Sequence, residues 1–400
     1  MGIYETLIQR GFVKQVVDEE SLKNKLNGEP LTFYIGFDPT GDCLHIGHLL
    51  PLMCMAWLQR AGHHPIIVMG GGTAMVGDPS GKDKTREMLT AEDIEANLAA
   101  QRPLFAKLID LENATILNNS EWLTSLNYIQ FLRDIGKHFS VNSMIKAEGA
   151  RQRLERGQGY SFIEFNYHLL QSYDFLHLYK HHNCVLQVGG DDQWFHFCGG
   201  MDLIRRETGE HAYAFTIPLL TRADGKKMGK TEKGAVWIDG DRVSPFEYYQ
   251  YWINVQDADA FKFMKLYTFL PETELTQYAN LEGAATRQTK QRLAFEATAL
   301  VHGVAAAEAA KVASEAAFSG GQSVSMPTTY VEFPIALVDV LSSTLCNSKS
   351  DARRQIKGGA IKLDGGDGKQ AVTDIGAQLT EEVVVWRGKK NCIRVLAAEV

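Results

Sequence analysis

The chain has 400 residues, of which 45% are hydrophobic and 22% charged, and its formal net charge is -7. This length allows two or three domains that each bury a core, and the composition is typical of a globular protein. No apolar run approaches the roughly 20 residues of a membrane helix, so we expect no membrane contact and a cytoplasmic location.

The cysteines and the basic residues exclude some kinds of site and indicate others. The six cysteines form no Cys-x-x-Cys pair, which argues against disulfides and zinc, and we expect no metal held by the protein itself. The net charge is acidic, but basic residues gather near Arg151, over 222–233 and over 349–362. They indicate local contacts with phosphates, although a solvated helix face explains any single stretch equally well.

The first part of the chain alternates strand and helix signals. Residues 31–37 are aromatic and β-branched, as in a strand, and turn residues follow them. Residues 45–60 form an apolar run of helical length, and 65–69 form a second short strand. Strand, loop, helix and strand at this spacing make a βαβ unit. We therefore expect an α/β fold with a Rossmann-like parallel sheet.

The same pattern continues further along the chain and then changes. Residues 161–179 are expected to form a helix, and 184–188 a buried strand that ends at two glycines. After about residue 242 the strand signal fades, and Pro245 and the Ala-rich residues 284–317 indicate helices. We expect a catalytic domain over 1–220, a mobile loop over 221–240, a helical domain over 241–318, a linker over 319–334 and a small α+β module over 335–400.

The motif His45-Ile46-Gly47-His48 begins the helix expected over 45–60. Its two histidines are three positions apart and therefore lie on one face of the first turn. A helix N-terminus presents unpaired N–H groups and a positive dipole, which favour a phosphate group. Gly47 leaves room for a nucleotide against the backbone. The motif predicts a site for nucleotide phosphates, although two such histidines can also be without function.

A second motif, Lys227-Met228-Gly229-Lys230-Thr231, follows the turn residues Ala223-Asp224-Gly225. The turn and the glycine predict a mobile loop. Two lysines and a hydroxyl on such a loop suit a triphosphate whose charge must be neutralised during transfer. Because a lysine-rich loop alone is more often a solvated surface, this interpretation depends on the first motif.

Together the two motifs resemble the two signatures of class I aminoacyl-tRNA synthetases. Further segments are similar, in order, to motifs of the bacterial tyrosyl-tRNA synthetases: 34–40, 77–82, 173–175 and 187–194. The resemblance covers nearly the whole chain, including the C-terminal module, which is similar to a small RNA-binding fold. Gly229 and Thr231 replace serines of the wider class, and Ile35 replaces a cysteine that contacts ribose in some relatives.

The resemblance implies a two-step reaction. L-tyrosine and ATP, whose phosphates carry Mg²⁺, give tyrosyl-adenylate and pyrophosphate, and the tyrosyl group then moves to the 3′ end of tRNA(Tyr). It also implies a homodimer, and a helical domain that meets the anticodon end of the tRNA. Carboxylate attack on the α-phosphorus needs no protein nucleophile, so catalysis consists of positioning and charge stabilisation.

The resemblance also implies roles for particular residues. Tyr34 and Asp174 would bind the phenol of tyrosine. Phenylalanine would leave both groups without a hydrogen-bond partner and would therefore bind less well. Tyrosine-charging enzymes are the standard example of such discrimination. The ammonium and carboxylate groups of tyrosine would be held by Asp78, Tyr167, Gln171 and Gln193. The helical spacing of Tyr167, Gln171 and Asp174 does not distinguish a substrate-binding face from a solvated polar face, because both place these residues on one side of the helix.

The remaining residues concern ATP and tRNA. Those expected to act on the phosphates as catalytic groups are Thr40, His45, His48, Lys227 and Lys230. Those expected to bind ATP are Asp38, Gly47, Lys82, Arg86, Gly190, Asp192 and Thr231; a divalent-metal site at Asp191-Asp192 ranks below the ribose contact. Those expected to bind tRNA are Arg151, Lys349, Arg353, Arg354 and Lys357.

Three alternatives remain. The tryptophan-charging relatives share the fold and both signatures, but Tyr34 with Asp174 and the C-terminal module argue against them. Small nucleotidyltransferases have a similar His-x-Gly-His motif but lack the long extension. A non-catalytic RNA-binding protein derived from a synthetase has no reason to retain both histidines and both lysines of the signatures.

Overall fold

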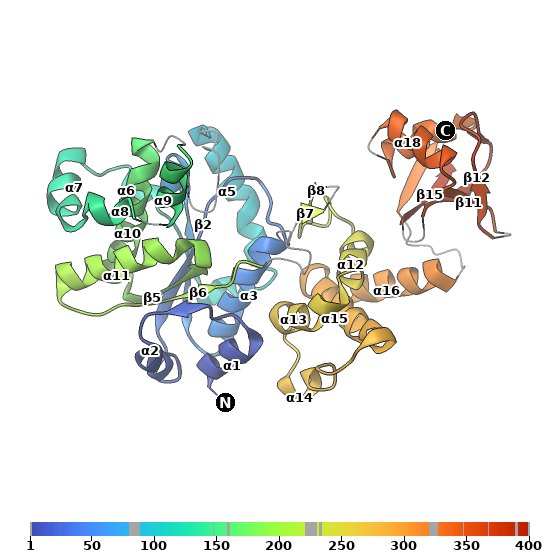
Figure 1. Ribbon diagram of the computed structural model, residues 1–400. Coiled ribbons are helices and arrows are strands. Elements are labelled where there is room, and N and C mark those ends of the chain that lie inside the picture. Colours follow the sequence, from blue (N-terminus) through green and yellow to red (C-terminus); the bar gives the residue numbers. More distant parts are fainter. Residues whose placement is uncertain are drawn as a thin grey trace. The chain divides into compact units, whose positions relative to one another are not determined.

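The computed structural model describes residues 2–79, 89–146, 148–157, 161–220, 230–231, 234–319, 327–346, 348–366, 368–388 and 391–398 (Figure 1). The chain divides into two compact units. The first comprises Met1–Arg242 and Val255–Leu293, and the second Val243–Asn254 and Ala294–Val400.

A six-stranded sheet forms the centre of the first unit. Its strand order is β1 (Gln15–Val16), β6 (Tyr213–Ile217), β5 (Cys184–Gly190), β2 (Thr32–Phe37), β3 (His64–Met69) and β4 (Thr115–Asn118). All neighbours are parallel except β1 and β6. The expected α/β fold with a parallel-dominated sheet is confirmed. The chain order reverses between β2 and β5, and such a switch point opens a crevice at the carboxyl ends of the strands.

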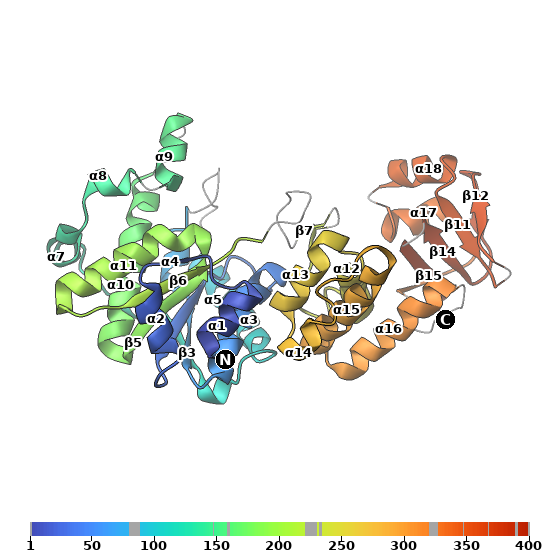
Figure 2. The same cartoon turned by 60° about the horizontal axis from the view of Figure 1, so that its bottom comes forward.

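Helices cover both faces of this sheet, so its strands are apolar on both sides. On β2 and β3, Tyr34, Ile66 and Val68 pack in one hydrophobic cluster with residues of α10 (Phe162–His182) and α11 (Trp194–Thr208). The alternate residues Phe33, Ile35 and Ile67 are buried as well. In Figures 1 and 2, α10 and α11 lie side by side on one face and α3 (Ile46–Arg60) lies on the other.

The sequence explains where these helices begin and end. Ser161 and Glu164 form a capping box at the start of α10, and Asn183 ends that helix in the left-handed conformation. Gly209 ends α11 in the same way, with φ of 80°. The strands expected over 31–37, 65–69 and 184–188 and the helices expected over 45–60 and 161–179 are all confirmed.

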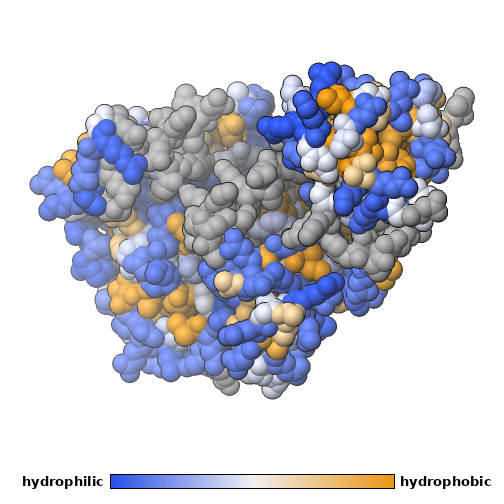
Figure 3. Space-filling view, turned by 45° about the vertical axis from the view of Figure 1, so that its right-hand side comes forward, coloured by the Kyte–Doolittle hydropathy of each residue, from blue (hydrophilic) through white to orange (hydrophobic). Residues whose placement is uncertain are grey.

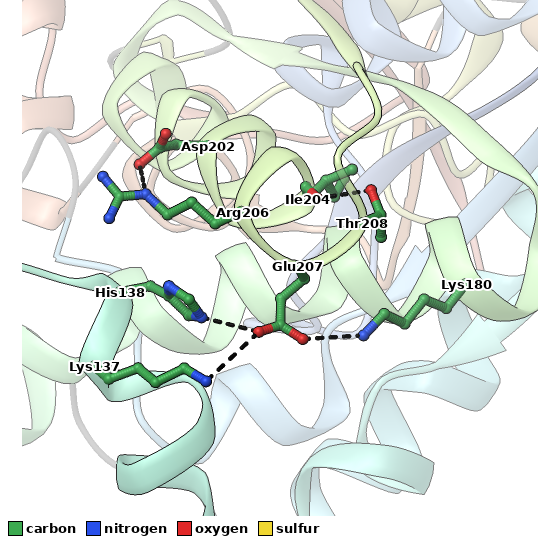
Figure 4. Close-up of polar contacts among 8 residues, drawn as sticks. All are labelled: Lys137, His138, Lys180, Asp202, Ile204, Arg206, Glu207 and Thr208. Carbon is green, nitrogen blue, oxygen red and sulfur yellow. Dashed lines mark hydrogen bonds and ion pairs between the residues drawn. The ribbon is translucent and has the colours of Figure 1, made fainter.

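One partly buried carboxylate joins three elements of the first unit (Figure 4). Glu207 of α11 accepts hydrogen bonds from His138, over 2.9 Å, and from Lys180 of α10, over 3.3 Å, and Lys137 lies 4.0 Å away. His138 and Lys137 belong to the short helix η2 (Gly136–His138). These contacts lower the pKa of Glu207, the hydrogen bond from His138 first. They hold η2 against the α10–α11 pair.

The first unit contains further helices and a two-stranded hairpin. The helices are α1 (Ile3–Arg10), α2 (Glu19–Leu26), α4 (Gly71–Ala74), α5 (Ala91–Phe105), η1 (Leu111–Asn113), α6 (Ser120–Leu123), α7 (Tyr128–Asp134), α8 (Val141–Met144), α9 (Glu148–Glu155), η3 (Asp191–Gln193), α13 (Asp257–Tyr267), α14 (Glu272–Leu275) and η4 (Gly283–Ala285). A two-stranded hairpin consists of β7 (Lys230–Thr231) and β8 (Gly234–Ala235).

Helix α13 belongs to the first unit although its residues fall in the range expected for a helical domain. The buried guanidinium of Arg10 donates hydrogen bonds to the carbonyls of Lys265, over 2.9 Å, and Thr268, over 2.8 Å, and to that of Leu270. It also lies 4.1 Å from the centre of the Trp57 ring on α3. A buried cation that binds the carbonyls at a helix C-terminus ties α13 to α1 and α3.

The second unit contains a helical part and the C-terminal module. In the helical part, α12 (Pro245–Ile253) begins at a capping box of Ser244 and Glu247 and buries Trp252. It packs against α16 (Val304–Ser319), where Gln250 donates to Ser314 over 2.8 Å. Helix α15 (Thr286–His302) precedes α16.

The C-terminal module is a five-stranded sheet with two helices. Its strand order is β12 (Gln370–Val372), β11 (Ile361–Asp364), β14 (Val383–Arg387), β15 (Asn391–Ala397) and β9 (Thr328–Val331). The core lies between the sheet and the helices α17 (Leu337–Ser343) and α18 (Lys349–Lys357), and β10 (Ile335–Ala336) pairs with β13 (Gln378–Leu379). β9 pairs in parallel with β15. The sheet therefore includes part of the segment that was expected to be a linker.

Within the described ranges, none of the helices combines the length and the apolar character that crossing a bilayer requires. On the face of the molecule in Figure 3, hydrophobic side chains form several patches among a mostly hydrophilic surface.

Candidate active site

A cavity of about 280 Å³ lies at the carboxyl ends of β2 and β5. This is the position at which open parallel sheets bind ligands. Many of the residues singled out from the sequence line this one cavity: Tyr34, Asp38, Thr40, His48, Asp78, Tyr167, Gln171, Asp174, Gly190, Asp192 and Gln193. The structure thus brings together side chains from β2, the loop after it, α3, α10, β5 and η3.

Tyr34 and Asp174 form the deep end of the cavity. Both residues are 3% exposed. Within the described part of the chain the Tyr34 hydroxyl has no hydrogen-bond partner. A buried hydroxyl without a partner costs free energy, and a ligand atom in the cavity would supply the missing partner. Burial and the nearby Asp174 raise the pKa of Tyr34 well above its usual value, so the phenol stays neutral.

Two further side chains hold the Asp174 carboxylate. Asn119 donates to Oδ2 over 3.0 Å, and the Trp122 indole donates to Oδ1 over 2.7 Å. Burial raises the pKa of Asp174 to about 7, although both hydrogen bonds favour the charged form. The carboxylate therefore titrates near neutral pH and has a fixed orientation. An ionised carboxylate accepts several hydrogen bonds, which leaves capacity for a ligand hydroxyl.

Polar groups at the middle of the cavity come from three elements. Gln193 donates to Oδ2 of Asp78 over 3.0 Å. The Tyr167 hydroxyl lies 3.4 Å from Oδ2 of Asp38, and Thr73 also donates to Asp38. Gln171 of α10 also lines the cavity. Carboxylates beside a tyrosine hydroxyl and the amides of Gln171 and Gln193 suit a ligand that carries an ammonium group next to a carboxylate.

The two histidines of the first signature have fixed orientations at the start of α3. His45 is the N-cap residue, and its Nδ1 accepts from the backbone N–H of Gly47 over 3.0 Å. Nδ1 of His48 accepts from the backbone N–H of His45 over 3.2 Å. The rings stack with centroids 4.0 Å apart. Because each Nδ1 is an acceptor, a neutral ring carries its proton on Nε2 and presents a donor there.

Burial and His45 lower the pKa of His48 to about 3, so its ring is neutral at physiological pH. The His48 ring therefore acts as a hydrogen-bond donor and not as a cation. The positive end of α3 supplies the favourable potential for an anion at this position.

The segment after the second signature lies against the first signature. The backbone N–H of Ile46 donates to the carbonyl of Val236 over 3.0 Å, and that of Ile238 donates to the carbonyl of Leu44 over 3.0 Å. Between them Trp237 forms a bridge with His45. Lys230 and Thr231 lie in β7, of which only the backbone is described. Lys227, Lys82 and Arg86 fall outside the described residues.

The two neighbouring aspartates of η3 have different surroundings. Asp191 accepts hydrogen bonds from Gln15 and Thr216, each over 2.6 Å, so its carboxylate joins β1 and β6. Asp192 is exposed and lines the cavity. In the described parts of the chain no cluster of three or more His, Cys, Asp or Glu is placed to hold a metal ion.

None of the basic residues expected to bind tRNA lines this cavity. Arg151 forms an ion pair with Glu155 on α9, over 2.8 Å. On α18, Lys349 pairs with Asp339 over 2.6 Å and Arg354 with Asp351 over 2.7 Å. Arg353 and Lys357 of the same helix are exposed and one helical turn apart, so they share a face.

Sequence reasoning assigned no role to Asn119, Trp122 or Gln187, although Gln187 begins the motif over 187–194. Gln187 is 2% exposed, lines the cavity, and its Oε1 has no partner among the described residues. A single glutamine inside an apolar strand was a signal that could have been used, because a buried amide needs partners. Asn119 and Trp122 carry no comparable signal, since they are distant from Asp174 in the sequence.

Known proteins resemble this chain in sequence and in structure. Residues 26–319 match the family of class I tRNA synthetases for tryptophan and tyrosine. The chain is 48% identical to a tyrosine–tRNA ligase of Clostridium botulinum, over 99% of both chains, and 48% identical to that of Acetivibrio thermocellus, over 98% and 99%. A C-terminally truncated mitochondrial tyrosyl-tRNA synthetase of Aspergillus nidulans has a similar solved structure, with a TM-score of 0.70, 29% identity and coverage of 78% of this chain and 92% of that one. The chain therefore belongs to the class I tRNA synthetases, and within that class to the tyrosine–tRNA ligase family.

Proposed function

We propose that the chain activates L-tyrosine with MgATP to give tyrosyl-adenylate and pyrophosphate, and then transfers the tyrosyl group to the 3′ end of tRNA(Tyr). Relatives that share 48% of its residues over 99% of their length carry the name tyrosine–tRNA ligase. The observation that carries the choice of amino acid is the buried Tyr34 hydroxyl beside the fixed carboxylate of Asp174.

The phenol of tyrosine reaches this pair at the deep end of the cavity. Its hydroxyl donates to Asp174 and accepts from Tyr34, so both buried groups gain a partner. Phenylalanine leaves both groups without one, and an unpaired buried polar group costs about 1–3 kcal/mol. Asp78, Tyr167 and Gln171 bind the substrate ammonium, and Gln193 orients the carboxylate toward ATP. The shared cavity that these side chains line supports these roles.

ATP lies at the mouth of the cavity, with its phosphates at the N-terminus of α3. Thr40, His45 and His48 contact the phosphates, Gly47 and Asp38 border the nucleotide, and Gly190 and Asp192 bind its ribose. Mg²⁺ is part of the substrate, bound to the phosphate oxygens. The positive charge on the pyrophosphate side comes from Lys82, Arg86, Lys227 and Lys230, and the Thr231 hydroxyl donates a hydrogen bond to a phosphate oxygen. The tyrosine carboxylate attacks the α-phosphorus, the bond to the β-phosphate breaks, and pyrophosphate leaves.

Hydrogen-bond donors that are already oriented stabilise the negative charge that develops on the phosphate oxygens during the reaction. In His45 and His48, Nδ1 accepts a hydrogen bond from a backbone N–H, so each ring presents Nε2 as a donor. Preorganised donors of this kind lower an activation barrier without reorganisation at the moment of reaction. The reaction therefore needs no general base among these residues.

The second step brings the tRNA to the same site. We assign the helical part of the second unit to the anticodon end of the tRNA. The C-terminal module, with the exposed Arg353 and Lys357 on α18, adds contacts with the phosphate backbone. Arg151 on α9 adds a further cation in the first unit. The cytoplasm is the compartment that fits these substrates and the six cysteines, none of which forms a disulfide.

The active form is a homodimer. Large apolar side chains are exposed on three helices of the first unit: Ile129 of α7 is 71% exposed, Val141 of α8 60% and Phe162 of α10 68%. Such side chains are typical of a surface that a partner covers. Replacing Ile129 and Phe162 by Asp should give a monomer in sedimentation velocity. The matched control Val304→Asp, on a residue that is 67% exposed in α16, should leave the dimer intact.

The experiment that tests the proposed function is ATP–pyrophosphate exchange with each of the twenty amino acids. Exchange with tyrosine alone supports the proposal. Exchange with tryptophan instead assigns the chain to the tryptophan-charging relatives, and no exchange with any amino acid supports a non-catalytic RNA-binding role. Charging of purified tRNA(Tyr) then tests the second step.

A further inference from the structure

We infer that His168 and His196 act as a hydrogen-bonded pair that positions the side chains that bind the substrate ammonium group. Neither histidine lines the cavity. The inference rests on the proposed function, because it concerns the amino-acid site. It assigns a role to two buried polar groups that the reaction itself does not use.

The two rings join α10 to α11. His168 on α10 and His196 in the first turn of α11 are 6% and 5% exposed, and their Nδ1 atoms lie 3.0 Å apart. One Nδ1 carries the hydrogen and donates to the other. Burial lowers the pKa of both imidazoles, for His168 well below its usual value. Both rings are therefore neutral at physiological pH and do not repel a nearby ammonium group.

The surroundings of the pair are aromatic and closely packed. The His168 ring stacks on Phe195 with centroids 4.0 Å apart and meets Phe139 edge-on at 5.2 Å. Gly199 makes this arrangement possible, because a Cβ there would lie 2.4 Å from Cε1 of His168. Two imidazoles so enclosed have few other orientations. Removal of one of them leaves the other buried without a hydrogen-bond partner, which costs free energy.

The pair lies directly behind the ammonium-binding residues. His196 packs edge-on against the ring of Tyr167, with centroids 5.4 Å apart. It also follows Gln193 by three residues, and Gln193 donates to Asp78 over 3.0 Å. The hydrogen bond between His168 and His196 thus fixes the distance between two helices. One is α10, which carries Tyr167 and Gln171, and the other is α11, at whose start Gln193 lies. A shift between these helices displaces Tyr167 and, through the hydrogen bond from Gln193, Asp78, which both bind the ammonium group, while Tyr34 on β2 stays in place.

Matched variants separate this role from simple core packing. His168→Leu removes the hydrogen bond and keeps an apolar filling, whereas His168→Asn keeps an amide group where Nδ1 lies. For His168→Leu we expect the KM for tyrosine in pyrophosphate exchange to rise about three- to tenfold. The KM for ATP should be unchanged, and His168→Asn should recover most of the loss. The pair His196→Leu and His196→Asn gives the same test where a His168 variant does not fold.

Two tyrosine analogues make the readout specific to the ammonium group. Tyramine carries the phenol and the ammonium, and 3-(4-hydroxyphenyl)propionate carries the phenol and the carboxylate. Against His168→Leu, tyramine should lose inhibitory affinity about as much as tyrosine does, and the ammonium-free analogue should lose less. Equal losses for both analogues, or an unchanged KM in a folded Leu variant, would overturn the inference. Absence of tyrosine-dependent exchange in the unaltered protein would instead contradict the proposed function.

Discussion

Trp122 donates its indole N–H to Oδ1 of Asp174 over 2.7 Å, in a cavity where Asp174 is almost completely buried. Asp174 is thereby oriented toward a substrate phenol while burial raises its pKa to about 7. Selectivity for tyrosine thus depends on a carboxylate whose charge is only partly secured at neutral pH.

The pH dependence of tyrosine use follows from this pKa. Below about pH 7 Asp174 is protonated and loses an acceptor site for the phenol, so kcat/KM for tyrosine should fall toward acid pH, approaching about tenfold per pH unit. Above about pH 7 it should reach a plateau. Trp122→Phe removes a group that stabilises the charged form, so the inflection should move to higher pH. Pyrophosphate exchange between pH 5.5 and 9 measures both profiles, and identical inflections in the two proteins would contradict this role of Trp122.

The same carboxylate makes stability depend on pH. Its pKa in the folded protein, about 7, is above the ordinary value of 3.8. The folded state therefore holds the proton over a range in which the unfolded state has lost it. This contribution is fully present below about pH 4 and is lost as the pH rises through about 7. Asp174→Asn has no charge to bury, so its melting temperature should vary less than that of the unaltered protein between pH 5 and 8.

Tyr34→Phe should stabilise the fold and weaken the function. It removes a buried hydroxyl that has no partner among the described residues, so the free energy of unfolding should rise by about 1 kcal/mol. It also removes a phenol contact, so the KM for tyrosine should rise about tenfold and the preference over phenylalanine should fall. Thr298→Val is the control, because its buried hydroxyl on α15 is also unpartnered within the described ranges but lies outside the cavity. It should raise stability with no change in KM; a drop in stability of Tyr34→Phe would show that the hydroxyl is satisfied.

The sequence predicts those elements whose formation depends on neighbouring residues, and it does not predict contacts between residues that are far apart in the chain. The strands over 31–37 and 65–69 and the helix over 45–60 were predictable because their apolar patterns and turn residues act within a few positions. The parallel pairing of β9 with β15 was not, since it joins residues far apart in the chain and β9 has only four residues. The placement of α13 was missed because Arg10, the residue that binds it, has the sequence signature of a surface cation.

The candidate site shows the same limit. Tyr34, Asp174 and the two histidines could be named because they sit in recognisable motifs. Asn119 and Trp122 could not, because only the three-dimensional packing of α6 against α10 brings them to Asp174. Residues that contact a ligand follow motifs, whereas those that orient the contacting residues follow the fold.

Gly47→Ala should slow tyrosine activation. A Cβ at Gly47 would lie 2.7 Å from Cε1 of His45, so the imidazole must move from its place at the N-terminus of α3. Transition-state contacts are sensitive to such displacements, and we expect kcat for exchange to fall about 10- to 100-fold with little change in the KM for tyrosine. Gly41→Ala is the matched control, because a Cβ there meets no described atom within 4 Å. If Gly41→Ala lowers kcat more than Gly47→Ala does, displacement of His45 does not explain the loss of activity.

Removal of the C-terminal module should separate the two steps of the reaction. The cut belongs after Ser319, where α16 ends, and not after Pro334, because the later cut leaves β9 without the strand with which it pairs. The protein truncated at Ser319 should retain tyrosine-dependent pyrophosphate exchange within about twofold and lose much of its tRNA charging. Loss of exchange in a truncated protein that still unfolds cooperatively would show that the module contributes to the first step.

Arg353 and Lys357 test the tRNA interaction more finely. Both are exposed on one face of α18, whereas Lys349 and Arg354 form ion pairs with Asp339 and Asp351. Replacing both by Ala should raise the Kd for tRNA, leave exchange unchanged, and reduce the slope of log Kd against log salt by about one for each phosphate that the protein no longer binds. The double change of Lys23 and Lys25 to Ala on α2 removes the same charge elsewhere and should leave that slope unchanged. If both double variants lower the slope equally, the effect comes from net charge and not from α18. A slope that changes only for Arg353 and Lys357 assigns the phosphate contacts to this helix face.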